Sequence, residues 1–316
     1  MPRHFKGDQA FDSESLYGTE TEMPYSGTRS FMRRRLTRDL SGVDYAIMGI
    51  PYDLSVSGRP GARFGPEAIR RASSQLSWGD VWPWGFDPFD RLAVADTGDV
   101  SYRRGQPQDM LAKAHDQALA ILKTGARLLT FGGDHSVTYP LLKAHAAIHG
   151  PLGIIQFDAH RDTAVSEHLD HGTFLHHAVK DGFVDPARSI QIGIRTHYTH
   201  DDAMTVLYRP WLRNRCATDL AAEIRRVVGG KPAYLSFDID CIDPAFAPGT
   251  GTPVVDGLHP HEAIDCIRAL ALPNIVGMDV VEVSPPHDPA ETTALLAASV
   301  ALEHLCAMAS LKPPRS

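Results

Sequence analysis

Cysteine is scarce in this 316-residue chain, which contains only four. No two of them have the CxxC spacing of zinc sites and redox pairs, so the sequence indicates neither kind of site. A long chain with isolated thiols is also unlike a small secreted domain stabilised by disulfides. We therefore interpret the four as reduced thiols of a cytoplasmic protein: Cys216, Cys241, Cys266 and Cys306.

Basic residues are also fewer than acidic residues. The 31 Lys and Arg residues are outnumbered by 38 Asp and Glu residues, which gives a formal net charge of −7 and a pI near 6.1. A nucleic-acid-binding domain usually carries a basic face, so this composition argues against one. The N-terminus lacks the apolar core of a signal peptide, and no apolar run approaches membrane-spanning length. We expect no nucleic-acid or membrane partner and a cytoplasmic location.

Strand-like and helix-like segments alternate along most of the chain. This alternation predicts βαβ units, and hence an α/β fold in which a mostly parallel sheet is covered by helices on both faces. Residues 1–40 are polar and are predicted to form an N-terminal arm, while residues 41–316 form a single domain. The predicted strands are 44–50, 91–97, 127–133, 151–158, 189–194, 232–240 and 274–283, and the predicted helices are 108–125, 219–230, 259–272 and 292–309.

Four of the predicted strands end in acidic or imidazole side chains, in the segments FGGDHS, FDAHRD, FDIDCID and DVVEVSP. Taken singly, each has an ordinary explanation, because a histidine can cap a strand-to-helix turn and a DxD pair often forms a turn. In open parallel sheets, however, ligands collect beyond the carboxyl ends of the strands. Four such strand ends together therefore favour a shared site.

The segment FDAHRD has the most informative spacing. Asp158, His160 and Asp162 follow an apolar run at positions i, i+2 and i+4, which share one face of an extended segment. By the same alternation Arg161 should point outward, away from them. Two carboxylates packed together without a positive neighbour would be costly, so we expect a cation among them.

The predicted metal site uses more side chains than one ion needs. Six candidates exceed the four ligands of a tetrahedral zinc, whereas bridging carboxylates would let two metals share them. Four aspartates also balance the charge of two divalent cations. Carboxylate and imidazole ligands without thiolate suit Mn²⁺, with Ni²⁺, Co²⁺ or Zn²⁺ less suited, and we expect Cys241 to lie in the core. The predicted ligands are His135, Asp158, His160, Asp162, Asp238 and Asp240.

These motifs resemble those of the ureohydrolase family, which includes arginases, agmatinases and related guanidino hydrolases. The resemblance rests on GGDHS, DAHRD, SFDIDCIDPAFAPGTGTP and GMDVVEVSP, and it extends over about residues 30 to 310. The segments SGRPGARFGPEAIR, DTGDV and GLHPHEAIDCIRAL are similar to the bacterial agmatinase branch. The family implies a three-layer α/β/α sandwich, a dinuclear manganese centre, and trimers or hexamers.

The resemblance also implies roles for individual residues. His135 and Asp162 would belong to one metal, His160 and Asp240 to the other, and Asp158 and Asp238 would bridge both. The implied catalytic residues are Asp162, which would accept a hydrogen bond from the nucleophile, His171, which would pass a proton to the leaving amine, and Glu282, which would hold the guanidinium group. The implied reaction is hydrolysis of agmatine to putrescine and urea.

The substrate tail is less well defined. Ala164 occupies the position at which arginases have an asparagine for the α-carboxylate, which disfavours arginine. Agmatinases have a small or neutral residue where this chain has Arg161, so guanidinobutyrate is a rival if Arg161 reaches the pocket. Smaller or substituted guanidines and biguanides are further alternative substrates. Two alternatives come from other classes: a dinuclear phosphoesterase, and a catalytically silent regulatory subunit.

Overall fold

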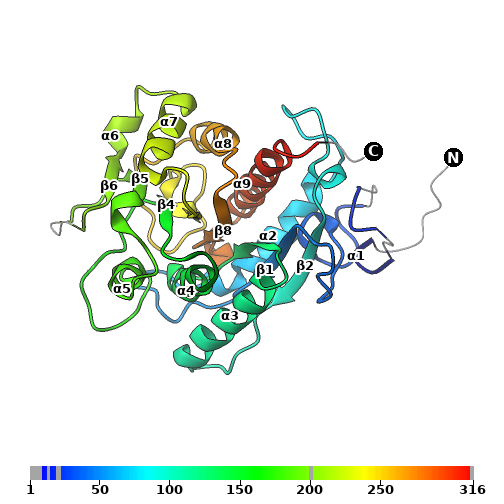
Figure 1. Cartoon of the computed structure of the whole chain (residues 1–316), viewed down its shortest axis with the longest axis horizontal. Helices are drawn as coiled ribbons and strands as arrows, with labels where there is room; N and C mark the ends of the chain where they lie inside the picture. The colour runs from blue at the N-terminus through cyan, green and yellow to red at the C-terminus, as the bar shows by residue number, and fades with distance from the viewer. Residues whose placement is uncertain (1–8, 13–14, 19–22, 199–201, 314–316) are drawn as a thin grey trace.

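The computed structural model describes residues 9–12, 15–18, 23–198 and 202–313, and they form a layered α/β structure (Figure 1). Its centre is an eight-stranded sheet in which every pair of neighbouring strands is parallel. The predicted α/β class and parallel sheet are thereby confirmed. The strands are β1 (Tyr45–Gly49), β2 (Val94–Asp99), β3 (Arg127–Phe131), β4 (Gly153–Phe157), β5 (Ile190–Ile194), β6 (Thr205–Tyr208), β7 (Ala233–Asp238) and β8 (Ile275–Val281).

Helices cover both faces of the sheet and complete the three layers. Residues of α3, α4 and α5 pack on one face, and residues of α2, α7, α8 and α9 pack on the other (Figure 1). Side chains of β1 alternate between the two faces, as the two-residue repeat of a strand requires. Tyr45 and Ile47 pack with α2, α7, α8 and α9, whereas Ala46 and Met48 pack with α3, α4 and α5. The α-helices are α1 (Gln9–Asp12), α2 (Gly65–Ser73), α3 (Pro107–Leu122), α4 (Thr138–His149), α5 (Phe174–Lys180), α6 (Arg209–Leu212), α7 (Ala217–Val228), α8 (Pro260–Ala269) and α9 (Thr292–Ala309).

The strand order determines where the polar strand ends meet. The order across the sheet is β2-β1-β3-β8-β7-β4-β5-β6. The four strands that end in the segments singled out above are β3, β8, β7 and β4, and they are consecutive at the centre of the sheet. Because all four are parallel, their carboxyl ends lie along one edge, and the side chains that follow them can converge.

Helix α9 is the most apolar helix among the described residues. By length and composition Thr292–Ala309 would be able to cross a membrane, which the sequence-based search for apolar runs did not anticipate. However, 83% of this segment is buried inside the protein, where it packs against α2 and α8. A helix that is apolar on all sides is expected in the core of a large domain.

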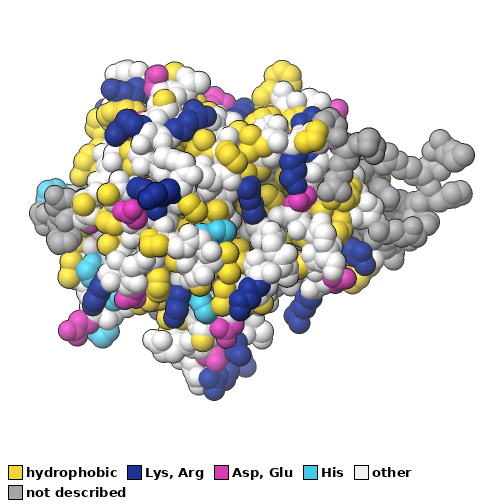
Figure 2. All heavy atoms as spheres, in the orientation of Figure 1, with side chains coloured by type: hydrophobic (Ala, Val, Ile, Leu, Met, Phe, Trp, Pro, Cys, Tyr) yellow, Lys and Arg dark blue, Asp and Glu magenta, His cyan; other side chains and the backbone are white. Residues whose placement is uncertain are grey.

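On the face shown in Figure 2, basic, acidic and hydrophobic side chains of the described residues are intermixed.

Part of the predicted N-terminal arm lies outside the described residues. Of the part that is described, Phe31 and Met32 are buried in the core with α2, and the Phe31 N–H donates to Asp96 at 2.9 Å. These contacts attach residues 31–34 to the edge of the sheet formed by β2. The division of the chain at residue 40 stays a prediction.

Candidate metal centre

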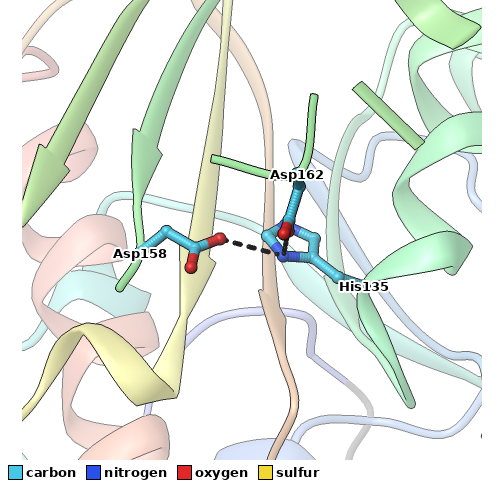
Figure 3. A group of neighbouring side chains, drawn as sticks. All are labelled: His135, Asp158 and Asp162. Carbon is cyan, nitrogen blue, oxygen red and sulfur yellow. Dashed lines mark ion pairs between the residues drawn. The ribbon is translucent and has the colours of Figure 1, made fainter. Parts of the chain in front are cut away.

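The carboxyl ends of β3, β4 and β7 bring one histidine and three aspartates into direct contact. Nδ1 of His135 lies 3.2 Å from Asp158 Oδ2, 3.0 Å from Asp162 Oδ2 and 3.1 Å from Asp238 Oδ2. Figure 3 shows the Asp158 and Asp162 carboxylates directed toward the His135 ring. His135, Asp158 and Asp162 form one of two groups in the described residues whose atoms lie close enough to hold a metal ion.

The second group shares Asp158 with the first. Nδ1 of His160 lies 2.9 Å from Asp240 Oδ2 and 3.6 Å from Asp158 Oδ1. Asp158 therefore directs one carboxylate oxygen toward each histidine, which is the geometry of a residue shared between two ions. All six predicted ligands are thus brought together, and five of them belong to the two groups, while the sixth, Asp238, contacts His135.

The backbone of the segment FDAHRD does not follow the predicted extended path. We expected an extended segment through Asp162, but β4 ends at Phe157 and Asp162 adopts a positive φ of 53°. The chain turns because Asp158 Oδ1 accepts a 2.6 Å hydrogen bond from the His160 N–H, the local contact by which aspartate bends a backbone. The alternation argument was therefore wrong for these residues, although the three side chains do meet.

Asp238 combines two roles that the sequence presented as alternatives. Its Oδ1 accepts the Asp240 N–H at 2.7 Å and so caps the short 3₁₀-helix Ile239–Cys241, while its Oδ2 contacts His135. The cap and the cluster contact use different oxygens of one carboxylate. Cys241 is fully buried in the apolar core, as predicted.

Without a cation, burial makes it costly in free energy for all the carboxylates of this cluster to be charged. Burial and the charge of Asp158 raise the pKa of Asp162 to about 7, and burial together with Asp240 and Asp158 raises the pKa of Asp238 well above its usual range. Burial would lower the pKa of His135, but contacts with the three carboxylates outweigh it and raise that pKa. A divalent cation would replace these protons, because metal ligands bind in their deprotonated form.

A buried network fixes the ring orientation of His135. Ser236 Oγ donates to Asp279 at 2.7 Å and therefore accepts from His135 Nε2 at 2.8 Å. In the neutral ring Nε2 then carries the proton, and Nδ1 is left as the atom that faces the carboxylates, with no hydrogen-bond partner among the described residues. Asp279 also accepts hydrogen bonds from Thr138 and Tyr234. This is the usual second layer of a metal-binding histidine, and the cluster fits a metal.

Sequence reasoning missed Ser236 and Asp279. Both are fully buried polar residues inside otherwise apolar strands, β7 and β8. A buried polar group needs a hydrogen-bond partner, so a serine and an aspartate in the middle of such strands were the available signal.

Glu282 and His171 form a pair beside the cluster. Glu282 Oε1 accepts from the His135 N–H at 2.8 Å and from His171 Nδ1 at 3.0 Å, whereas its Oε2 is buried without a hydrogen-bond partner among the described residues. Burial lowers the pKa of His171, but Glu282 outweighs that effect and raises it to about 9. On the other side, His171 Nε2 accepts from the Ser57 N–H at 3.0 Å, which favours the neutral ring. His171 can therefore hold or release a proton.

A cavity of about 260 Å³ opens next to the cluster and is lined by two of the three predicted catalytic residues, His171 and Asp162, but not by Glu282. It is large enough for a small organic molecule and has a mixed polar and apolar wall. The other residues that line it are Ser57, His160, Arg161, Ala164, Gly172, Thr196, His197, Tyr198, Asp238 and Thr252.

Arg161 does not point outward as predicted, and it lines the cavity beside the acidic cluster. Its side chain is only 8% exposed. Its Nε donates to Gln191 Oε1 at 2.9 Å, its Nη2 forms an ion pair with Asp202, and its guanidinium carbon lies 5.7 Å from the centre of the Tyr198 ring. The expectation of an outward side chain failed because it assumed a continuing strand.

Comparisons with known proteins agree with this geometry. Residues 43–307 match the model of the arginase family. An agmatinase of Chromobacterium violaceum is 50% identical over 310 residues, covering 97% of this chain and 96% of that protein. The crystal structure of a hypothetical agmatinase from Burkholderia thailandensis superposes with a TM-score of 0.94 at 48% identity, covering 96% and 98% of the two chains. Proclavaminate amidino hydrolase from Streptomyces clavuligerus superposes with a TM-score of 0.85 at 38% identity, covering 91% and 99%.

Proposed function

Because the chain belongs to the arginase family, we propose that it is a dinuclear-metal hydrolase that cleaves a guanidino group to urea and an amine, with agmatine as substrate and putrescine and urea as products. The observation that carries this proposal is the buried cluster of four aspartates and two histidines beside Glu282, whose Oε2 lacks a partner among the described residues. The 50% identity to an agmatinase over nearly the whole chain supports agmatine among the guanidino compounds.

We infer that His135 and Asp162 hold one metal, His160 and Asp240 the other, and Asp158 and Asp238 both. Carboxylates and imidazoles without thiolate favour Mn²⁺, with Ni²⁺ and Co²⁺ next. Two divalent ions here would lower the pKa of bound water, so that hydroxide is available near neutral pH. The orphaned Nδ1 of His135 and the raised pKa values of Asp162 and Asp238 support this assignment.

The residues around the cluster would orient the substrate and move protons. Glu282 Oε2 would accept a charge-assisted hydrogen bond from the guanidinium, a planar cation whose carbon must face the nucleophile. Asp162 would accept a hydrogen bond from that nucleophile. His171 would donate its proton to the leaving amine, because its Glu282 partner keeps the ring protonated near neutral pH.

The far end of the pocket favours an amine tail over a carboxylate tail. Ala164 offers no side-chain donor to an α-carboxylate, and the Arg161 guanidinium is already paired with Asp202. A guanidinobutyrate carboxylate would therefore meet no unpaired arginine there. The family also contains a relative named for proclavaminate, so the tail has to be tested by a panel.

The test is urea release by the Mn²⁺-loaded protein from a panel of agmatine, arginine, guanidinobutyrate and smaller guanidines. We expect agmatine to give the highest kcat/KM, and Arg161→Ala to leave the ratio of agmatine to guanidinobutyrate unchanged. If the wild type had a higher kcat/KM for guanidinobutyrate than for agmatine, and Arg161→Ala reversed this order, agmatine would be excluded as the preferred substrate. Phosphate release from esters without urea release would indicate the phosphoesterase, and bound metal without turnover would indicate a silent subunit.

Glu282→Gln keeps the side-chain shape and removes its charge. Losing a charge-assisted hydrogen bond of roughly 1.5–3 kcal/mol should lower kcat/KM about ten- to a hundredfold, equally for every guanidino substrate. Because Glu282 also raises the pKa of His171, the alkaline limb of the pH–rate profile should move to lower pH. A loss confined to one substrate would contradict the assigned role.

The matched control for this variant is Glu291→Gln. Glu291 also has a positive φ, 56° against 63° for Glu282, but its carboxylate is exposed and pairs with Arg71. We expect its kcat/KM and pH profile to equal those of the wild type.

We also infer a cytoplasmic homo-oligomer, either a trimer or a hexamer, as the family resemblance implies. Sedimentation velocity of the purified chain distinguishes these two states from a monomer.

A further inference from the structure

A buried arginine, Arg161, lies between the candidate ligands His160 and Asp162, and its guanidinium contacts Gln191 and Asp202. We propose that Arg161 is a positioning residue, which sets the orientation of Asp158 through two buried glutamines, Gln191 and Gln156. The proposal rests on the metal centre of the proposed function, and it concerns how firmly the shared carboxylate is held rather than which substrate is cleaved.

A continuous series of hydrogen bonds joins Arg161 to Asp158. Arg161 Nε donates to Gln191 Oε1 at 2.9 Å, and Gln191 Nε2 donates to Gln156 Oε1 at 2.7 Å. Gln156 Nε2 then donates to Asp158 Oδ2 at 2.6 Å. Gln156 and Gln191 lie directly opposite each other on β4 and β5, and both are fully buried. The series is therefore built into the register of the sheet.

Arg161 determines the direction of this series. An amide side chain has a donor end and an acceptor end, whereas a guanidinium can only donate. Gln191 must therefore turn its oxygen toward Arg161, and its nitrogen then faces both Gln156 Oε1 and the Arg161 carbonyl oxygen, 2.6 Å away. Gln156 in turn must present its N–H groups to Asp158. Each amide has one satisfied orientation, and the direction ends in donation to the carboxylate.

The consequence for the metal centre concerns the carboxylate of Asp158. This residue directs Oδ2 toward His135 and Oδ1 toward His160, so rotation of its carboxyl group would disturb both groups of ligands. Without the Arg161 side chain, Gln191 Oε1 would lose its donor, and the two amides would be oriented only by the main-chain carbonyl oxygen of residue 161 and by Asp158 itself, so the carboxylate would be held less firmly. Partners that orient a ligand in this way typically contribute about 10- to 100-fold to metal affinity.

Asp202 and Tyr198 hold the arginine in place from the other side. Asp202 forms an ion pair with Arg161 Nη2, and the Tyr198 ring lies beside the guanidinium. The pair places no net charge next to the cluster, because the carboxylate offsets the guanidinium. Arg161 therefore acts through hydrogen-bond direction and not through its charge.

The experiment measures Mn²⁺ affinity by titrating the metal-free full-length protein, together with its Tm. Arg161→Met and Gln191→Met should each weaken Mn²⁺ binding about 10- to 100-fold, and Arg161→Lys, which keeps a group that only donates, should recover most of the loss. Gln191→Met leaves the Arg161–Asp202 pair in place, so it tests the series even if Arg161→Met does not fold.

The matched control is Arg70→Met. Arg70 is also a buried arginine, 5% exposed, and it pairs with Asp96 and Asp99 on β2, at the opposite edge of the sheet. We expect a lower Tm with wild-type Mn²⁺ affinity. If Arg161→Met or Gln191→Met lowers Tm but binds Mn²⁺ like the wild type, the proposal is overturned. Absence of Mn²⁺ binding by the wild type overturns both proposals, whereas bound Mn²⁺ without urea release overturns the proposed function alone.

Discussion

Asp158→Ala is expected to abolish the binding of both metals and to reduce urea release to background. Asp158 is fully buried and is the one residue common to the two groups of candidate ligands, so its removal takes an oxygen from each ion. Asp238→Ala should have the same effect if Asp238 bridges. Elemental analysis of the Mn²⁺-reconstituted variants measures the metal content, and the wild type should hold close to two ions per chain.

Asp87→Ala is the control for these two variants. Asp87 is a buried aspartate that caps the 3₁₀-helix Pro88–Asp90 through the Phe89 N–H. Its loss should cost about 0.5–2 kcal/mol of stability and leave both metals bound. One tightly held metal in both Asp158→Ala and Asp238→Ala would contradict the shared assignment.

His171→Asn should retain both metals and lower kcat by about 100-fold or more. The His171 ring forms its hydrogen bonds with Glu282 and Ser57, neither of which is one of the six candidate ligands. Asparagine can preserve hydrogen bonds at this position, but it cannot transfer a proton, and loss of a positioned acid typically costs about 10²- to 10⁴-fold. Steady-state urea release and metal analysis separate the two effects.

His177→Asn serves as the comparison for this variant. His177 lies on the neighbouring helix α5 and contacts the His168 carbonyl oxygen at the surface. Its rate should equal that of the wild type. An undiminished rate in His171→Asn would exclude His171 from proton transfer.

Seven of the eight strands were predictable because each is a short apolar run next to a turn signal. β6 was missed, since Thr205–Tyr208 is a four-residue edge strand that is mostly half-buried or exposed and has an apolar run of only three residues. Helices α4 and α5 were missed as well. α4 has Pro140 in its first turn, and α5 has only seven residues, so neither presents a long uninterrupted period.

The candidate site was predictable as a set of strand ends but not as a geometry. The residue types and their place after apolar strands identified all six side chains of the cluster. The order of β3, β8, β7 and β4 depends on how the whole sheet assembles, which local spacing does not encode. The burial of Arg161 against Gln191 depends on a contact between distant segments. Periodicity along one strand cannot predict such contacts.

The strand order also has a consequence for folding during synthesis. β3 and β4 follow one another along the chain, yet β8 and β7 lie between them in the sheet. A ribosome releases β7 and β8 last among the strands, so the nascent sheet carries two unpaired inner edges until residue 281 has emerged. Open edges of this kind can pair with other chains, and parallel pairing over long sequence separations is slow. The centre of the sheet is therefore closed last, and until then the open edges of β3 and β4 are the part of the sheet most exposed to aggregation.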